Sequence, residues 1–506
     1  MFVLSAENMK KAEESAVANG CDYYTLMEKA GTECARVIAT EDKSEKITVL
    51  CGKGRNGGDG FVIARKLCEY GFGNVFVVLV NGEPTDELCV QMYEEMKKYP
   101  VNVTCLTEEM QSSVFHIKTA GVIVEAIFGI GFRGSLSGNS EIAVCEANKN
   151  LTAKKYAIDI PAGLPADGEF CDKLYFTTDV TLTMIALKPV QVLKPVCLLC
   201  GKTFVMDIGV RDDILEPFAE KYISLTAEEA VKNIKKRKYD SHKGCFGNVL
   251  TICGSRNMTG CVYLCNQAAV EIGAGLVTAA FPEGIYGTVT GKLNEPLMLP
   301  LKENKDGRIK TDAKTLYKKL EKSDVVAVGC GIGVDNDTKE LVRFLIENCK
   351  TMLILDADAL NCIASQPQIL KNAQCDIIIT PHPGEMARIT GSTVPADDKG
   401  RIRVACEIAE TYSVTVLLKG ANTVIAGKDG RVAINTTGNP SMARGGSGDV
   451  LTGLIAGLIP QCSDVFSAVC TAAYIHGAAA DYLAGNHGML SATPTRIIEN
   501  IHKCFM

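Results

Sequence analysis

The chain has 506 residues, of which 47% are hydrophobic and 22% charged, and this composition excludes a disordered, collagen-like or coiled-coil protein. The 53 Lys and Arg against 59 Asp and Glu give a net charge of −6, so there is no basic field to attract nucleic acid or anionic lipid. At about 150 residues per domain, the length indicates two to four domains.

Neither a membrane nor an oxidising compartment is indicated. The apolar stretches at 450–463 and 465–480 are each shorter than the ~20 residues that a membrane helix needs, and they favour buried helices. The 22 cysteines are scattered, and Cys197–Cys200 is the one Cys-x-x-Cys pair, without the further ligands of a structural zinc site. We therefore expect a cytoplasmic protein whose cysteines are mostly small buried side chains.

The first part of the chain alternates between helical and strand patterns. Apolar spacing predicts helix within residues 1–40 and at 64–69. Buried strands are predicted at 47–51, 75–80, 121–124, 155–160 and 180–184. This alternation predicts a parallel, doubly wound α/β sheet.

A loop with five glycines in nine residues, 52–60, follows the first strand. Gly52-x-Gly54-x-x-Gly57 fits the dinucleotide fingerprint, but the second strand ends Val80-Asn81, without the acidic residue that would bind a ribose. The loop instead carries Asn56 and Asp59. It therefore suits a polar ligand or a cation, with backbone N–H groups available for phosphate.

Two further carboxylates stand where strands end. Glu125 precedes a glycine turn, and Asp159 precedes Pro161 in the same way. Ligands of open α/β sheets bind outside the carboxyl ends of the strands. We therefore expect Glu125, Asp159 and Asp59 to converge on one site.

These segments, with Leu26-Met27-Glu28, resemble the NAD(P)H-hydrate epimerase family over about 1–215. The resemblance implies a Rossmann-like three-layer α/β/α fold and interconversion of the R and S forms of hydrated NADH and NADPH. Asp159 is our candidate for the catalytic acid/base group. The resemblance implies a potassium site at Asn56, Glu125 and Ala162. It implies substrate contacts at Arg55, Asn56, Gly57, Gly58, Asp59, Gly129, Ile130, Gly131, Phe132, Arg133, Gly134, Ser135 and Asp159. Arg55, Glu125 and Ala162 depart from the Asn, Asp and Ser that are usual in the family.

A basic stretch, 232–238, is typical of a solvated linker or helix end, and the α/β alternation then resumes. The two domains are therefore expected near 1–220 and 225–506. A long helical region is predicted at 450–480. Strands are predicted at 248–252, 275–280, 325–329, 352–356, 376–380, 414–419 and 423–426.

The segment Gly445-Gly446-Ser447-Gly448-Asp449 precedes the predicted helical region. Glycines before a helix expose N–H groups to an anion, and the helix dipole adds to the attraction. Asp449 could then act as a base on a hydroxyl that faces a bound phosphate. Asp356 and Asp358 could hold Mg²⁺ directly or through water.

The second half resembles the ribokinase-like superfamily, and within it the ADP/ATP-dependent NAD(P)H-hydrate dehydratase family, over about 230–500. The motifs are 242–247, 272–277, 355–361, 382–385 and 438–449. Asp449 is implied as the catalytic residue. Substrate contacts are implied at Cys261, Gly331, Gly333, His382 and Asp449. Nucleotide contacts are implied at Lys419, Gly420, Ala421, Asn422, Thr423, Gly445, Gly446, Ser447 and Gly448. Departures are Cys330 for the usual Pro, Arg444 and Ser447 for Thr, and Cys261 for Ala.

The leading hypothesis is a bifunctional repair enzyme. It would epimerise the hydrates of NADH and NADPH, which are called NADHX and NADPHX, and dehydrate their S form at the expense of ADP or ATP. Mg²⁺ and K⁺ are the expected cofactors. We expect no nucleic acid or membrane partner, and we expect the chain to form a homo-oligomer. One alternative is a ribokinase-like small-molecule kinase. A second is that the first domain is a non-catalytic binding module.

Overall fold

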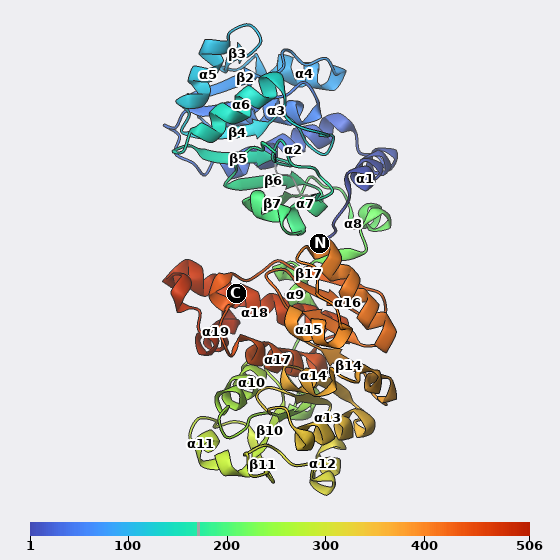
Figure 1. The fold of residues 1–506 in the computed structure, drawn as a ribbon. Coiled ribbons are helices and arrows are strands. Elements are labelled where there is room, and N and C mark those ends of the chain that lie inside the picture. The colour runs from blue at the N-terminus through green and yellow to red at the C-terminus, as the bar shows by residue number, and fades with distance from the viewer. Residues whose placement is uncertain (170–172, 506) are drawn as a thin grey trace. The chain divides into compact units, whose positions relative to one another are not determined.

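The computed structural model describes residues 1–169 and 173–505, and the chain divides into two compact units, Met1–Glu220 and Lys221–Met506 (Figure 1). The second unit begins slightly before the expected residue 225. The reason is that Tyr222–Ser224 forms a strand, β8, which pairs in parallel with β17 (Val432–Asn435) of the C-terminal sheet.

The N-terminal unit contains a parallel sheet with the strand order β3-β2-β1-β4-β5-β6-β7. Its strands are β1 (Ile47–Cys51), β2 (Val75–Leu79), β3 (Asn102–Cys105), β4 (Val122–Ala126), β5 (Lys154–Ile158), β6 (Val180–Met184) and β7 (Lys202–Met206). The sequence patterns missed β3 and β7. Both are edge strands, and their exposed residues interrupt the apolar run that marks a buried strand.

Helices cover both faces of this sheet. Alternate strand residues point to opposite faces, so Val49 packs with α2–α4 whereas its neighbour Leu50 packs with α5 and α6. The helices are α1 (Ala6–Ala18), α2 (Tyr23–Ile38), α3 (Arg55–Glu69), α4 (Glu87–Met96), α5 (Met110–Lys118), α6 (Gly138–Lys149), α7 (Pro189–Val192) and α8 (Asp212–Leu215). The expected three-layer α/β/α arrangement is therefore confirmed.

The C-terminal unit has the strand order β11-β10-β9-β12-β13-β14-β15-β16-β17-β8. One end of this sheet is antiparallel, because β16 pairs antiparallel with both β15 and β17. Loop 419–422 is too short for the crossover of a dozen or more residues that parallel strands need. The other strands are β9 (Asn248–Ile252), β10 (Leu276–Pro282), β11 (Leu297–Leu301), β12 (Val325–Val328), β13 (Met352–Leu355), β14 (Ile377–Ile379), β15 (Thr415–Leu418) and β16 (Thr423–Ala426).

This sheet is also covered on both faces, with α10 and α17–α19 on one side and α12–α16 on the other (Figure 1). The helices are α9 (Ala227–Asn233), α10 (Gly260–Glu271), α11 (Tyr286–Thr290), α12 (Ala313–Leu320), α13 (Asn336–Asn348), α14 (Asp358–Ile363), α15 (Pro383–Thr390), α16 (Asp398–Tyr412), α17 (Ser447–Leu458), α18 (Val465–His487) and α19 (Pro494–Asn500). The predicted helical region 450–480 is two helices, since Pro460 lies between them and Asp464 caps the second.

The basic stretch is only partly a linker. Its start belongs to α9, and the Lys235 N–H then donates to the Gln461 carbonyl while Arg237 stacks on Phe246. These residues therefore pack onto the C-terminal unit. Within the described residues, no helix is both long enough and apolar enough to span a membrane.

Candidate active sites

The glycine loop of the N-terminal unit is shaped by close backbone packing. A Cβ on Gly52 would lie 2.1 Å from the Ile127 carbonyl oxygen, and a Cβ on Gly57 would lie 2.0 Å from the carbonyl oxygen of Gly52. Residues Arg55–Asp59 form the start of α3, whose N-cap Gly54 supplies no side chain. Polar side chains of this first turn therefore sit beside the end of β4.

Asp159 is the centre of a buried polar network at the end of β5. Its Oδ1 accepts hydrogen bonds from Lys188 Nζ at 2.7 Å and Thr183 Oγ1 at 3.1 Å. Its Oδ2 accepts from the Ile130 N–H at 3.2 Å. A Cβ on Gly129 would come within 2.8 Å of that same oxygen. Asp159 has φ +66°, a conformation that costs a non-glycine residue energy and is concentrated at functional sites.

Two more carboxyl groups belong to this network. Burial, followed by repulsion from Asp159 and Glu13, raises the pKa of Asp59 well above its usual range. Burial and the charge of Asp159 also raise the pKa of Glu13. The site thus combines Asp59, whose protonated form is favoured by burial, with Asp159, which is paired to Lys188. Sequence reasoning missed Lys188, Thr183 and Glu13. Thr183 lies near the end of β6, but no glycine motif or carboxylate marks that strand end, and Lys188 and Glu13 lie outside the strands.

The three residues of the implied potassium site meet at the turn after β4. Asn56 Nδ2 donates to the carbonyls of Phe128 (2.8 Å) and Ile158 (3.1 Å), and this leaves its buried Oδ1 with no hydrogen-bond partner. Glu125 is fully buried and accepts from the N–H groups of Ile127 and Ala162. Burial raises the pKa of Glu125 to about 8. An orphaned oxygen beside a buried acid fits a cation.

The remaining implied epimerase contacts lie on the two flanking segments. The guanidinium of Arg55 stacks 4.2 Å from the ring centre of Tyr23, and it lies 3.8 Å from Glu13. Arg133 folds back onto the carbonyls of its own loop, at Ile130 and Phe132. Contact between substrate and the segment 129–135 stays a prediction.

In the C-terminal unit, Asp356 holds together the ends of several strands. Its Oδ1 accepts from Lys419 Nζ and Thr380 Oγ1, both at 2.7 Å, and its Oδ2 accepts from Thr452 Oγ1 at 2.8 Å. Burial opposes ionisation, but the Lys419 charge and these hydrogen bonds hold the pKa of Asp356 below its usual value. Asp356 is therefore a buried anion already neutralised by a lysine.

The ion pair of Lys419 with Asp356 gives a stability prediction. Lys419→Met is expected to lower the unfolding free energy of the C-terminal unit by about 3–5 kcal/mol, because it leaves Asp356 buried and unpaired. The matched control is Lys428→Met, which breaks a surface pair with Asp376 and should cost less than about 1 kcal/mol. Urea denaturation followed by circular dichroism measures both, and equal losses would contradict the assignment.

Asp449 lies in the first turn of α17, directly behind the glycine loop. Gly446, the N-cap of this helix, has φ +97°, and a Cβ on Gly448 would lie 3.4 Å from Lys419 Nζ. Burial, and then the negative charge of Asp356, raises the pKa of Asp449 to about 6. A carboxylate with such a pKa is ionised at neutral pH and still suited to accept a proton. The loop, the lysine and the carboxylate are thus brought together as predicted.

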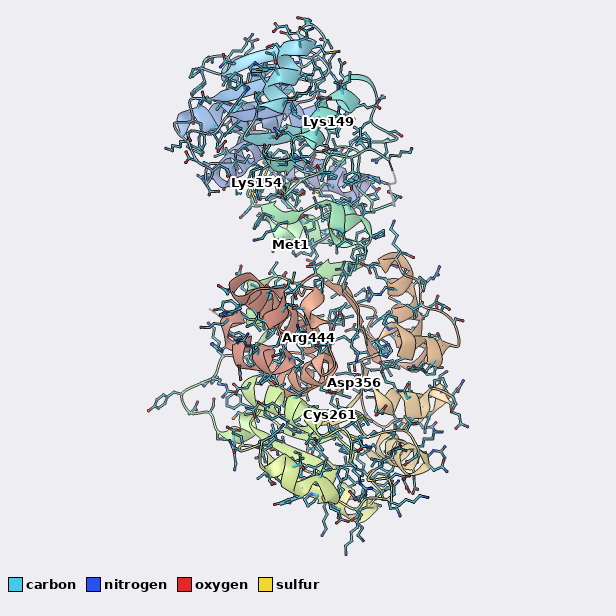
Figure 2. All side chains as sticks on the ribbon, turned by 60° about the vertical axis from the view of Figure 1, so that its left-hand side comes forward. Met1, Lys149, Lys154, Cys261, Asp356 and Arg444 are labelled. Atoms are coloured by element: carbon cyan, nitrogen blue, oxygen red, sulfur yellow. The ribbon has the colours of Figure 1, made fainter. Side chains whose placement is uncertain are left out.

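The other implied substrate contacts line neighbouring loops. Cys261 Sγ, on α10, donates to the Cys330 carbonyl at 3.1 Å, and the Gly333 N–H donates to Asp358 Oδ2 at 2.8 Å. Figure 2 labels Cys261 and Asp356 in this unit. His382 is half exposed and caps α15, since its Nδ1 accepts from the Gly384 N–H.

Several implied nucleotide contacts use their side chains within the fold. Asn422 Nδ2 donates to the buried Asp398, and Thr423 Oγ1 donates to the carbonyl of Gly420. Ser447 Oγ donates to the carbonyl of Met442. These side chains therefore stabilise the loops, and only the backbone groups of these residues remain to contact a nucleotide. Arg444, also labelled in Figure 2, bonds the Leu490 carbonyl.

Comparisons with known proteins agree with this division. Residues 249–503 match the family described as NAD(P)H-hydrate dehydratase, and residues 23–190 match the YjeF-related protein N-terminus. The chain is 36% identical to the bifunctional NAD(P)H-hydrate repair enzyme Nnr of Moorella thermoacetica, over 96% of this chain and 93% of the relative. It is 32% identical to the protein of the same description from Escherichia coli K12, over 96% and 91%.

A solved structure also matches the C-terminal unit. It is the ADP/ATP-dependent NAD(P)H-hydrate dehydratase of Bacillus subtilis, co-crystallised with ATP and Mg²⁺. Its identity to this chain is 29%, the match covers 55% of this chain and 96% of that one, and the TM-score is 0.47.

The fold and the two polar sites define a two-unit α/β enzyme with a site at the carboxyl ends of each sheet. The chain belongs to the family of bifunctional NAD(P)H-hydrate repair enzymes.

Proposed function

We propose that the N-terminal unit interconverts the R and S hydrates of NADH and NADPH, and that the C-terminal unit dehydrates the S form at the expense of ADP or ATP. The dehydratase assignment rests on Asp449, which lies behind the glycine loop at the start of α17. Burial and the negative charge of Asp356 raise the pKa of Asp449 to about 6. Relatives that share almost the whole chain carry the bifunctional description.

In the dehydratase reaction, Asp449 accepts the proton of the ring hydroxyl as that oxygen attacks the terminal phosphoryl group of the nucleotide. The new C–O–phosphate bond makes phosphate the leaving group in place of hydroxide. The lone pair of the ring nitrogen then expels phosphate, and loss of the neighbouring proton restores the reduced nicotinamide. The N–H groups that begin α17 and the Lys419 ammonium face the phosphates.

In the epimerase reaction, the hydrated carbon loses its hydroxyl and regains it from the other face. Departure as water needs a proton, and the raised pKa of Asp59 suits this carboxyl group to supply it. The return of water needs a base, and Asp159 is positioned for that role by Lys188 and Thr183. The two carboxyl groups then exchange roles in the reverse direction.

Mg²⁺ would fit as an ion carried by the nucleotide phosphates. Asp356 does not suit a direct ligand, because Lys419 and two hydroxyls already bond its oxygens. The negative charge of Asp358 contributes to the raised pKa of Asp449, and these two carboxyl groups could hold the waters of a hydrated ion. The bound ion would neutralise charge on the transferring phosphoryl group.

K⁺ would fit beside Asn56 Oδ1, which is buried without a partner, with Glu125 supplying charge. Ala162 offers only its carbonyl, which already accepts from the Phe176 N–H, and its own N–H bonds Glu125. The cation would hold the turn between β4 and segment 129–135, where the substrate contacts are implied.

Glu125 gives a prediction on pH and potassium. Its folded pKa of about 8 exceeds its ordinary value, so the folded chain binds the extra proton and stability falls as pH rises from about 4.5 to 8. In potassium-free buffer, the melting temperature of the N-terminal unit should drop by about 10 °C between pH 5 and pH 8. Glu125→Gln should remove this drop, and potassium should reduce it.

Calorimetry of the whole chain in tetramethylammonium and in potassium buffers measures the effect. The control is Glu141→Gln, an exposed side chain on α6, which should keep the wild-type pH dependence. An unchanged drop in Glu125→Gln would refute the role of Glu125.

The proposed function is tested by following the reduced-nicotinamide absorbance with mixed-epimer hydrate, Mg²⁺, and ADP or ATP. Recovery of the whole pool, faster than spontaneous epimerisation, supports both sites. A plateau at the share of the S form would leave the N-terminal unit a binding module. No recovery with either nucleotide would favour a small-molecule kinase.

We also propose that the enzyme works in the cytoplasm and as a homo-oligomer. The described cysteines are free thiols, as is typical of a reducing compartment. Sedimentation of the purified protein tests the oligomer.

A further inference from the structure

Three cysteines of the C-terminal unit come together in its interior. Cys253 follows β9, Cys265 lies on α10, and Cys330 follows β12. Each is 0% exposed, all three are free thiols, and their Sγ atoms lie within 4.8 Å of one another. We propose that these three thiols form a binding site for one Cu⁺ ion.

The spacing suits three sulfurs around one ion. A triangle with sides of at most 4.8 Å has its centre within about 2.8 Å of each corner, against about 2.3 Å for a metal–thiolate bond. A closure of a few tenths of an ångström per side chain therefore completes the site. Rotation of a cysteine about one bond is enough for a movement of that size.

Backbone hydrogen bonds fix the positions of Cys253 and Cys330 before any ion binds, and Cys265 is held on α10. The Cys253 N–H donates to the Ala280 carbonyl, and the Gly254 N–H donates to the Cys330 carbonyl at 2.8 Å. The second bond ties the end of β9 to the end of β12. The site therefore needs little ordering when it is occupied.

Cu⁺ is favoured over Zn²⁺ by the set of ligands. Structural zinc takes four ligands in a tetrahedron, whereas among the described residues this group comprises three sulfurs. The nearby thiol of Cys261 already donates to the carbonyls of Met258 and Cys330. Soft thiolates in a buried, three-coordinate arrangement select monovalent copper.

The charge and proton balance is explicit. Three thiols bind one Cu⁺ and release three protons, so the occupied site carries a net charge of −2. Burial disfavours such a charge, but the ammonium of Lys419 lies close enough to Cys330 for their charges to interact. Three metal–sulfur bonds replace three S–H bonds, and no oxidant or reductant takes part.

The site adjoins the dehydratase carboxylates. Cys330 Sγ donates to Asp356 Oδ2 at 3.7 Å and also hydrogen-bonds Asp449. Binding of Cu⁺ removes that donor and places negative charge beside both carboxylates. Copper should therefore inhibit the dehydratase, a consequence that rests on the proposed function, whereas binding itself does not.

The binding experiment uses the full chain without oxygen, titrated with Cu⁺ against a chromophoric Cu⁺ chelator. Wild type should hold one equivalent that Cys265→Ser loses, with affinity falling at least ~10-fold. The matched control is Cys470→Ser, another buried thiol of the same unit, which should keep it. Equal copper retention by Cys265→Ser and wild type would overturn the site.

Further readouts keep the test decisive. Cys253→Ala provides a second ligand variant if Cys265→Ser does not fold. X-ray absorption should show three sulfurs around copper in wild type; two sulfurs, or tighter binding of zinc with four ligands, would overturn the proposal. One equivalent of Cu⁺ should slow the wild-type dehydratase at least ~10-fold and leave Cys265→Ser unaffected. If the untreated chain has no dehydratase activity, the proposed function fails and the binding data still decide.

Discussion

Asp449→Asn is expected to lower the dehydratase rate at least ~10³-fold and to leave the epimerase rate of the same chain unchanged. Asparagine keeps the shape of the side chain but cannot accept the hydroxyl proton. Asp449 is half-buried in the first turn of α17, beside Lys419 and the glycine loop, where the substituted side chain leaves no other base in its place. The epimerase site lies in the other unit and serves as the internal control.

The pH dependence gives an independent check on the same residue. The base must be ionised, so the wild-type dehydratase rate should rise with pH up to about 6 and level off above it. Asp449→Asn should have no such step in its residual rate. Stopped-flow measurements with the S hydrate and saturating nucleotide separate chemistry from binding. If Asp449→Asn lowers the dehydratase rate less than ~10-fold, or keeps the rise in rate near pH 6, the proton transfer belongs to another group.

Asp159→Asn is the second large effect that we expect, a fall of about 10²–10⁴-fold in the epimerase rate with dehydration of pure S hydrate unchanged. Asp159 has φ +66°, and asparagine is one of the few residues that adopt this conformation readily. The variant should therefore fold. It loses the carboxylate that Lys188 and Thr183 hold in place.

Epimer exchange is measured by following the R and S hydrates by chromatography without nucleotide. Asp207→Asn is the control, since Asp207 is exposed after β7 and bonds only the N–H of Gly209 among the described contacts. Lys188→Met should reproduce part of the loss, because it leaves Asp159 without its cation. Wild-type exchange in Asp159→Asn would remove Asp159 from the mechanism.

The residues that local pattern could identify are those in a glycine loop or at the end of a strand. Strands 180–184, 248–252 and 423–426 were predicted with the bounds of β6, β9 and β16. Asp159, Asp449 and Glu125 were identified because they follow a buried strand or begin a helix. Parallel strands bring their carboxyl ends to one edge, so position along the chain was enough to place them.

Partners across the sheet could not be found in this way. Lys188 follows an apolar run 29 residues after Asp159, and Lys419 lies 63 residues after Asp356. Nothing in either local pattern indicates the other member of the pair. The antiparallel pairing of β15 with β16 is different, because the short loop 419–422 between the two strands, and not their composition, decides its direction.

The sequence by itself therefore determined the two α/β units, the family and the positions of the main carboxylates, since these follow from periodicity and glycine motifs. The tertiary structure alone decided what these carboxylates contact and how burial and neighbouring charges shift the pKa values of Glu125, Asp356 and Asp449. It paired Asp356 with Lys419, left Asn56 Oδ1 without a partner, and gathered Cys253, Cys265 and Cys330. The reason is that burial and charge act through space, and distance in space is not encoded locally along the chain.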